Sequence, residues 1–137
     1  MKNIPNMVLL IDDDRPTNYL NQRLLTQSNP NSLVKSVLNG VEALEYFRKV
    51  EKGEELRPEL IFLDINMPAM NGWEFLDAYA KLDHSLIGNV KIFMLSTTSN
   101  AFEIERGLTH DFVLDFIKKP LSKDVLLDVI SKHFYAL

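Results

Sequence analysis

Acidic side chains, a hydroxyl and a lysine follow the apolar runs of this chain. Asp12 and Asp13 follow the first run, Asp64 ends the third, and Ser96 and Lys119 follow the fourth and fifth. Carboxylates that are brought together repel one another, and without a cation some of them must take up protons. Oxygen ligands of this kind suit a hard divalent ion such as Mg²⁺. The sequence has no His/Cys cluster that would indicate zinc.

Each of these side chains also has an ordinary structural explanation. Acids after a strand often cap a helix, as we expect for Asp14. Ser96 could bond only to the backbone, and Lys119 could be an exposed lysine. The joint spacing favours a shared site, because each residue stands at the end of its own apolar run.

Apolar runs alternate with segments of helical periodicity along the whole chain. The runs that we predict to be strands cover residues 7–11, 33–38, 60–64, 90–95 and 112–117. Strands that alternate with helices predict an α/β fold, (βα)5, with a parallel five-stranded sheet covered on both faces. Right-handed crossovers then place the carboxyl ends of all strands at one edge, where the acids would meet. The polar middle of the run 33–38 predicts an outer strand.

Helix starts and apolar helical faces can be predicted for several of the intervening segments. Ser122 is the expected N-cap of the last helix, and Asn100 with Glu103 resembles a capping box for a short helix. We expect a solvent-exposed loop at 51–58 and another loop at 83–89. The predicted core-facing positions of the second and last helices are Val41, Ala43, Leu44, Tyr46 and Phe47, then Val125, Leu126, Val129 and Ile130.

Length and composition fit one globular domain. The chain has 137 residues, of which 46% are hydrophobic and 25% are charged, and its formal net charge is -4. An acidic balance without a long basic run argues against a nucleic-acid surface. The absence of cysteine excludes disulfides, thiolate metal sites and a thiol nucleophile. The apolar run 7–11 is too short for a signal peptide or a membrane span, so we expect a cytoplasmic location without membrane attachment.

The sequence resembles the receiver domain of two-component response regulators, of the chemotaxis-regulator type. The matching stretches are residues 10–14, 64–72, 94–96 and 119–120, which read LIDDD, DINMPAMNG, MLS and KP. They extend over almost the whole chain. The resemblance implies a doubly wound, flavodoxin-like fold with strand order 2-1-3-4-5. It also implies a single stand-alone receiver domain over residues 1–137, without an output domain.

The resemblance further implies a Mg²⁺-dependent phosphoryl transfer in phosphorelay signal transduction. Asp64 would accept a phosphoryl group from a sensor histidine kinase or a histidine phosphotransfer protein and become an aspartyl phosphate. Asp12, Asp13 and Asp64 would hold Mg²⁺ together with the backbone carbonyl of Asn66. Lys119 would pair with the added phosphoryl group. The chain would not be an enzyme, apart from catalysing its own phosphorylation and dephosphorylation.

A conformational switch is the last element that the resemblance implies. The hydroxyl of Ser96 would bond the new phosphoryl oxygen, and Phe116 would turn inward into the vacated space. A cis peptide bond before Pro120 would direct the Lys119 side chain into the site. A downstream protein target would bind the face made by the fourth helix, the fifth strand and the fifth helix.

The sequence leaves other functions open. A haloacid-dehalogenase-like, Mg²⁺-dependent phosphohydrolase also uses an aspartyl nucleophile, but it normally has a second acid two residues later, where this chain has Asn66. A flavin-binding protein of the same shape is a weaker alternative, because three acids after the first strand would repel its phosphate. A pseudo-receiver that binds partners without phosphorylation is a further alternative, against which the intact acids argue.

Overall fold

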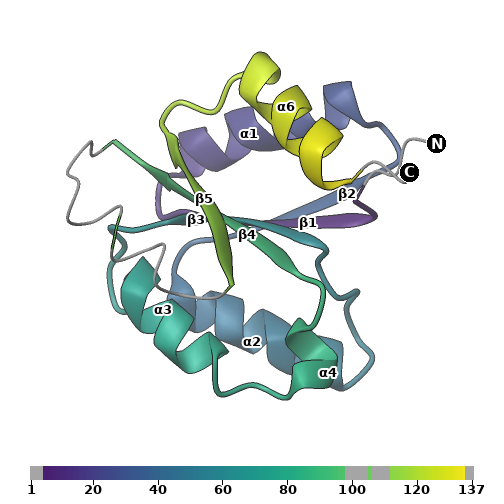
Figure 1. Ribbon diagram of the computed structural model, residues 1–137. Coiled ribbons are helices and arrows are strands. Elements are labelled where there is room, and N and C mark those ends of the chain that lie inside the picture. The colour runs from purple at the N-terminus through teal and green to yellow at the C-terminus, as the bar shows by residue number, and fades with distance from the viewer. Residues whose placement is uncertain (1–4, 98–104, 106–111, 135–137) are drawn as a thin grey trace.

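Five parallel strands form one sheet at the centre of the protein (Figure 1), seen here in a computed structural model that describes residues 5–97, 105 and 112–134. The strands are β1 (Met7–Ile11), β2 (Leu33–Val37), β3 (Leu60–Asp64), β4 (Lys91–Ser96) and β5 (Val113–Lys118). Their order is β2-β1-β3-β4-β5, and every neighbouring pair is parallel. The predicted doubly wound α/β fold, its strand order and the outer position of β2 are therefore confirmed.

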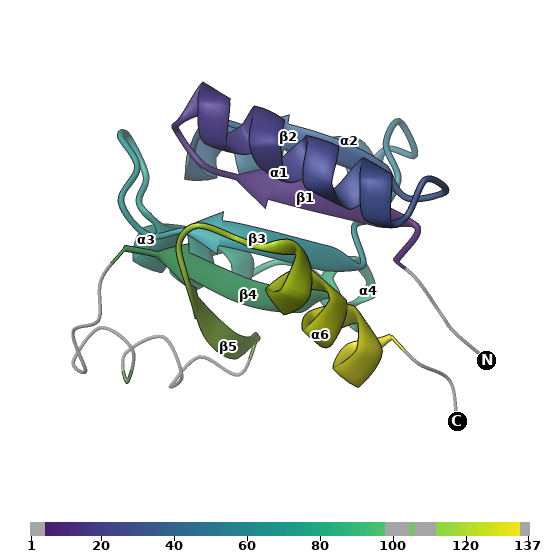
Figure 2. The same cartoon turned by 90° about the horizontal axis from the view of Figure 1, so that it is seen from above.

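Helices cover both faces of this sheet. They are α1 (Arg15–Ser28), α2 (Gly40–Glu51), α3 (Gly72–Tyr79), α4 (His84–Ile87) and α6 (Lys123–His133). Figure 1 shows α1 and α6 on one face and α2, α3 and α4 on the other, and Figure 2 shows α1 and α6 from above. None of the helices in the described part of the chain is long and apolar enough to cross a membrane.

The strands bury alternate residues on the two faces, because successive side chains of a strand point in opposite directions. On one face the sheet packs against Phe47 of α2 and against Phe75 and Tyr79 of α3, all of which are fully buried. We call this cluster the α2–α3 layer. On the other face, Phe62 and Phe93 pack against α1 and α6, in a cluster that we call the α1–α6 layer. These two layers fix the positions of the strand ends.

Most of the helices that follow a strand have a polar side chain as their N-cap. Asp14 accepts a hydrogen bond from the backbone N–H of Thr17, and Ser122 accepts one from that of Val125, so both predicted N-caps are confirmed. Asn39 caps α2 in the same way. Such caps satisfy N–H groups that have no partner inside the helix. α1, α2 and α6 therefore each begin at a defined residue just beyond a strand end.

Some sequence predictions were wrong in detail. The segment 83–89, predicted as a loop, contains the single helical turn α4. Val41 and Val125, predicted to face the core, are 49% and 36% exposed. At roughly 100° per residue, Val41 lies almost opposite Ala43, and Val125 lies about a quarter turn from the centre of the buried stripe of α6. The helix predicted at Asn100 lies outside the described residues, apart from Glu105, which is helical.

Candidate functional site

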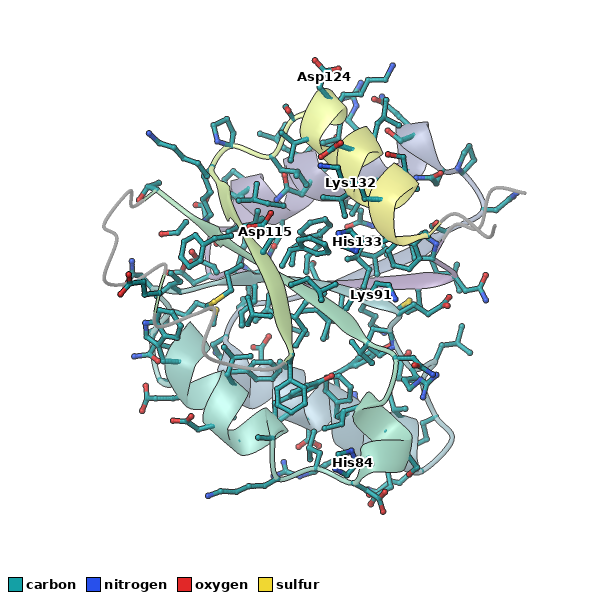
Figure 3. The ribbon with its side chains drawn as sticks, in the orientation of Figure 1. His84, Lys91, Asp115, Asp124, Lys132 and His133 are labelled. Carbon is teal, nitrogen blue, oxygen red and sulfur yellow. The ribbon has the colours of Figure 1, made fainter. Side chains whose placement is uncertain are left out.

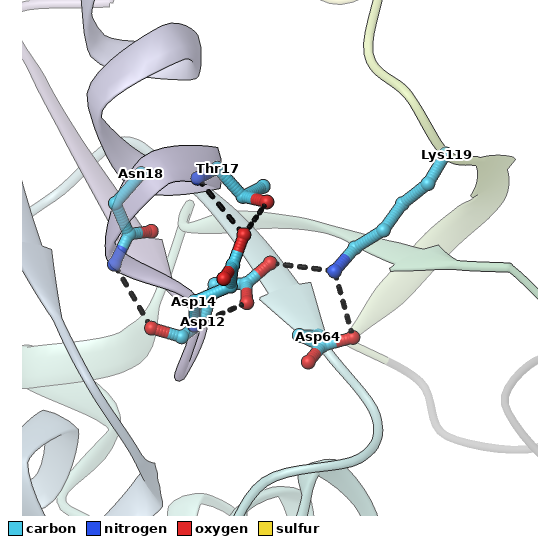
Figure 4. Close-up of polar contacts among 6 residues, drawn as sticks. All are labelled: Asp12, Asp14, Thr17, Asn18, Asp64 and Lys119. Carbon is cyan, nitrogen blue, oxygen red and sulfur yellow. Dashed lines mark hydrogen bonds and ion pairs between the residues drawn. The ribbon is translucent and has the colours of Figure 1, made fainter.

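The predicted site residues meet at the carboxyl edge of the sheet (Figure 4). Asp12 follows β1, Asp64 ends β3, Ser96 ends β4 and Lys119 follows β5. One carboxylate oxygen from each of Asp12, Asp13 and Asp64 can be chosen so that all three lie within 4.8 Å of one another. These side chains come close together because the carboxyl ends of parallel strands all lie on one edge of the sheet.

Lys119 connects the acids of two different strands. Its Nζ atom lies 2.7 Å from Oδ2 of Asp12 and 3.2 Å from Oδ1 of Asp64 (Figure 4). The backbone N–H of Lys119 donates to the carbonyl of Ser96 over 2.8 Å, and the Lys119-Pro120 peptide bond is cis, as predicted. Burial by itself lowers the pKa of Lys119, but the hydrogen bonds and charges of Asp12 and Asp64 outweigh burial and raise it. The ammonium group therefore stays charged inside the site.

The surroundings of Asp64 oppose its negative charge. It is 7% exposed, and burial, followed by the negative charge of Asp12, raises its pKa to about 6. The ammonium of Lys119 acts in the opposite direction, and Asp13 adds a smaller repulsion. A cation placed among these oxygens would favour the ionised form of Asp64. The site is thus arranged to gain free energy from binding positive charge.

Asp12 is held in place by hydrogen bonds to its side chain and to its backbone carbonyl. Its Oδ1 atom accepts a hydrogen bond of 3.0 Å from the backbone N–H of Asp14. Its carbonyl accepts one of 2.9 Å from Nδ2 of Asn18, a buried residue of α1. Sequence reasoning missed Asn18. The available signal was its place on the helical face that carries Asn21 about one turn later and Leu25 about two turns later, both of which are buried. Asn18 positions the first acid of the site.

Asp14 differs from the two acids that precede it. Its carboxylate accepts hydrogen bonds from the hydroxyl and the backbone N–H of Thr17, and these bonds lower its pKa (Figure 4). Asp14 therefore caps α1, as predicted. Within the part of the chain that the structure describes, Asp12, Asp13 and Asp64 are the acids that lie close enough together to hold a metal ion.

The proposed switch residues lie on the two last strands. Ser96 is 1% exposed at the end of β4, and it pairs in register with Lys118 of β5. Phe116 is partly buried and packs against the α2–α3 layer. The structure therefore places a buried hydroxyl at the carboxyl edge and an aromatic ring on the neighbouring outer strand.

The loop that follows Asp64 is held closely at its far end. The backbone N–H of Gly72 donates to the carbonyl of Ile65 over 2.8 Å. A Cβ atom on Gly72 would lie 2.7 Å from the carbonyl oxygen of Asp64 and 3.0 Å from Cα of Ile65, so only glycine fits there. Asn66, two residues after Asp64, is exposed within this loop. The backbone next to Asp64 is therefore fixed by its own neighbours.

The donor set fits a hard divalent cation such as Mg²⁺. Carboxylate oxygens from Asp12, Asp13 and Asp64 can approach one point, and one ammonium group is too little to neutralise three acids. Mg²⁺ is usually held by one or two carboxylates, while waters and phosphoryl oxygens complete its octahedron. Asp13 is exposed, which leaves the cluster open to solvent on that side.

Comparison with known proteins agrees with this geometry. Residues 8–131 match the family model of the response regulator receiver domain. The chain is 35% identical over 114 residues to a protein-glutamate methylesterase/protein-glutamine glutaminase of Burkholderia thailandensis, covering 82% of this chain but only 29% of that protein. It is 30% identical to the chemotaxis protein CheY of Listeria monocytogenes, covering 90% of this chain and 95% of that protein.

A solved structure has the same fold over nearly the whole chain. It is a two-component response regulator from Cytophaga hutchinsonii, with a TM-score of 0.83 and 27% sequence identity. The match covers 96% of this chain and 97% of the other.

Proposed function

This chain belongs to the response regulator receiver domain family, and on that basis we propose that Asp64 accepts a phosphoryl group in a phosphorelay. The observation that supports this most is the place of Asp64: it is buried at the carboxyl edge, within 3.2 Å of the Lys119 ammonium and grouped with Asp12 and Asp13. A carboxylate is a suitable nucleophile because it can attack phosphorus without first losing a proton. The product would be an aspartyl phosphate.

Asp12, Asp13 and Asp64, with the backbone carbonyl of Asn66, are the proposed Mg²⁺ ligands. When bound, the ion neutralises charge on the phosphoryl oxygens and orients them. Lys119 supplies the second positive charge, and it leaves its carboxylate partners to pair with the added group. Transfer of this kind depends on positioning and charge neutralisation more than on acid–base groups, and the residues present at the edge match that need.

The phosphoryl donor would be a sensor histidine kinase or a histidine phosphotransfer protein. α1 begins beside the site and presents Tyr19 and Leu20, which are 63% and 62% exposed. A hollow of about 240 Å³ lies between this helix and the segment that follows β5, and Leu20 and Lys119 both line it. Tyr19→Ala and Leu20→Ala should slow transfer from a phosphorylated histidine phosphotransfer protein but not from a small phosphodonor. Equal slowing with both donors would contradict this assignment.

Ser96 and Phe116 are the proposed switch. Ser96 would bond the phosphoryl group after transfer, and the shift of Phe116 would alter the face that includes β5 and α6. The fourth predicted helix of this face lies outside the described residues. A ligand shifts an equilibrium only through contacts that differ between two states, and the hydroxyl would supply such a contact.

A phosphohydrolase of the haloacid-dehalogenase type is less well supported. That class needs an acid two residues after the nucleophile, and Asn66 occupies the position. The intact acids likewise argue against a receiver that works without phosphorylation. Receiver domains are signalling domains, and we propose that this chain catalyses no reaction besides its own phosphorylation and dephosphorylation.

Incubation with Mg²⁺ and a small phosphodonor, followed by intact-mass measurement, tests the proposal. We expect one phosphoryl adduct on the wild type, none on Asp64→Asn, and none when a chelator removes the metal. Asp128→Asn, which changes an exposed acid of α6, is the matched control and should form the adduct normally. A full-yield adduct on Asp64→Asn would refute the assignment.

Calorimetric titration tests the metal ligands separately. Asp13→Asn should weaken Mg²⁺ binding by about tenfold or more, because it removes an oxygen ligand and its charge. Asp14→Asn is the control, since asparagine still caps α1 and this side chain is directed at Thr17. Equal losses in the two variants would show that overall charge, rather than ligation by Asp13, attracts the ion.

A further inference from the structure

A contact between the start of α2 and the loop that follows Asp64 has no role in the chemistry described so far. We propose that Gly40 and Met70, which form this contact, are positioning residues that hold the loop 65–71 in place for metal binding. The inference rests on the proposed function of Asp64, because that function gives the loop its task. Neither residue touches a reacting group, so both would act through the backbone of the loop.

The contact needs a glycine on the α2 side. The backbone N–H of Gly40 donates to the carbonyl of Met70 over 3.3 Å. A Cβ atom on Gly40 would lie 2.7 Å from Cγ and 2.8 Å from Sδ of Met70. A real Cβ atom does not come this close to other heavy atoms, so any larger residue would push the Met70 side chain away. Gly40 is buried, and Met70 packs against the α2–α3 layer.

Met70 follows a strained turn. The backbone N–H of Met70 donates to the carbonyl of Pro68 over 2.7 Å, and Ala69 between them has a φ of 66°. A three-residue turn with positive φ at its centre is rare, and an alanine adopts it only when the surroundings impose it. The next residue along the chain, Met70, is the one that Gly40 holds. The contact therefore maintains a backbone conformation that the loop would not keep alone.

Several residues of the loop 65–71 are fixed by burial or hydrogen bonds, and Asn66 lies between two of them. Ile65 and Met67 are buried to 2% and 9% exposure, and Gly72 is bound to the carbonyl of Ile65. Ile65 and Met67 pack in the α2–α3 layer, and Met70 is bound by Gly40, which belongs to another βα connection. If Met70 moved, the chain from Met67 to Asn71 would shift with it. The peptide unit that joins Asn66 to Met67 carries the proposed backbone ligand, and this shift would change the direction of its carbonyl.

The test compares Mg²⁺ affinity, by calorimetry, with the NMR shift of the Asn66 amide in metal-free protein. Gly40→Ala should shift the Asn66 amide and weaken Mg²⁺ binding by about tenfold, as changes behind a metal ligand commonly do. The double variant Gly40→Ala/Met70→Ala should bind no worse than Met70→Ala alone, because the clash with Cγ and Sδ has been removed. The remaining contact, with Cβ of residue 70 at 3.1 Å, is relieved by a shift of a few tenths of an ångström. This non-additivity is a result that general destabilisation would not produce.

Gly88→Ala is the matched control. It adds a methyl group at another tight position, 3.0 Å from the carbonyl oxygen of His84, next to α4 and away from the acids. It should lower stability while leaving Mg²⁺ affinity and the Asn66 amide unchanged.

Wild-type Mg²⁺ affinity in folded Gly40→Ala would overturn the inference while leaving the function of Asp64 intact. If Gly40→Ala does not fold, Met70→Ala decides, and the inference is overturned if that variant binds Mg²⁺ as the wild type does with an unmoved Asn66 amide. If the wild type itself binds no Mg²⁺ and forms no adduct, the proposed function fails and this inference fails with it.

Discussion

The carboxyl edge of the sheet and the two apolar layers are built from the same strands with opposite chemistry. Residues 8–11 of β1 and 60–63 of β3 are almost completely buried and entirely apolar. Asp12 and Asp64, which come next, are nearly as buried, with 3% and 7% exposure, but they carry carboxylates. Burial of apolar area stabilises a fold, whereas burial of like charges opposes it. The layers therefore supply the stability, and the edge supplies the chemistry at some cost in stability.

This difference implies that substitutions in the two regions should have separable effects. Truncation in a layer should lower the free energy of unfolding and leave the chemistry of the folded protein intact. Substitution at the edge should change phosphorylation or metal binding, while stability stays unchanged or rises. The following predictions test that separation, beginning with the largest expected effect.

Phe47→Ala should show most clearly that truncation in an apolar layer lowers stability. Phe47 is fully buried and lies edge-on to Tyr79, with ring centroids 5.4 Å apart. Its truncation should lower the free energy of unfolding by about 3–5 kcal/mol, measured by urea denaturation. Val41→Ala, on the exposed side of α2, should change it by less than about 0.5 kcal/mol. A loss of phosphorylation beyond the unfolded fraction of Phe47→Ala would break the separation of the two regions.

Lys119→Ala should show that substitution at the carboxyl edge slows phosphorylation. Removing the ammonium that faces Asp12 and Asp64 takes away the charge that we propose stabilises the transferring phosphoryl group. Removal of one such stabilising group commonly slows a reaction by about 10²–10³-fold. The rate of adduct formation with a small phosphodonor measures this. Lys118→Ala, the exposed neighbour, should react at nearly the wild-type rate, and an equal loss there would remove the special role of Lys119.

The pH dependence of stability should differ between the wild type and Asp64→Asn in metal-free protein. Burial raises the pKa of Asp64 to about 6, compared with 3.8 for an exposed aspartate. Between these values the folded state binds a proton that the unfolded state does not, so Asp64 destabilises the fold at pH 7 and ceases to do so as the pH falls towards 4. A pKa difference of this kind changes the free energy of unfolding by at most about 3 kcal/mol.

Asp64→Asn should accordingly be more stable than the wild type at pH 7.5, with the gap closing near pH 4. Comparing the two proteins cancels the titrating groups that do not interact with Asp64, among them His133. Figure 3 shows His133 near Lys91 and Asp115, and burial and the charges of Lys91 and Lys132 lower its pKa, so it opposes folding as the pH falls below 6.5. A stability difference between the two proteins that does not vary with pH would contradict the burial effect at Asp64.

Ser96→Ala should uncouple binding at the carboxyl edge from the structural change in β5 and α6. A hydrogen bond to a charged group contributes about 1.5–3 kcal/mol, enough to bias a two-state switch. With beryllofluoride in place of the phosphoryl group, the variant should still bind but should lose most of the NMR shift changes in β5 and α6. Ser36→Ala, exposed on the far outer strand, should retain them. A full wild-type response in Ser96→Ala would exclude Ser96 as the coupling residue.

Ala69→Gly should have the smallest effect, and its sign is informative. Ala69 has a φ of 66°, which glycine adopts without strain, so the substitution should raise the free energy of unfolding by about 0.5–1 kcal/mol. Ala78→Gly, within α3, should lower it by about 1 kcal/mol. Thermal or urea unfolding of both variants measures the contrast. A decrease in Ala69→Gly would mean that the turn is not strained.

The main features of the fold could be predicted from the sequence because two periodicities alternate regularly along it. Apolar runs predicted the strands, and the topology rule placed Asp12, Asp64, Ser96 and Lys119 at one edge. α4 was missed because a four-residue turn is too short to show helical periodicity. Val41 was misassigned because its spacing to Leu44 mimics a helical stripe that in fact is centred near Ala43 and Phe47. Local sequence patterns therefore predicted which strands and helices exist, and their order, better than they predicted which side of a helix faces the core.

The fine geometry of the site could not be predicted in the same way. The bridge from Lys119 to both Asp12 and Asp64 depends on where a flexible side chain settles between charges. The contact between Gly40 and Met70 joins residues far apart in the chain, and the positive φ of Ala69 occurs in a residue that rarely adopts it. Such features follow from the packed structure as a whole.

Reductive trapping tests the central claim most directly. Borohydride converts an aspartyl phosphate to homoserine, so peptide mapping by mass spectrometry identifies the modified residue. After incubation with Mg²⁺ and a small phosphodonor, we predict homoserine at position 64 in the wild type and none when a chelator is present. Homoserine at Asp12 or Asp13 instead, or none at position 64 in a protein that carries the phosphoryl adduct, would contradict the assignment of Asp64.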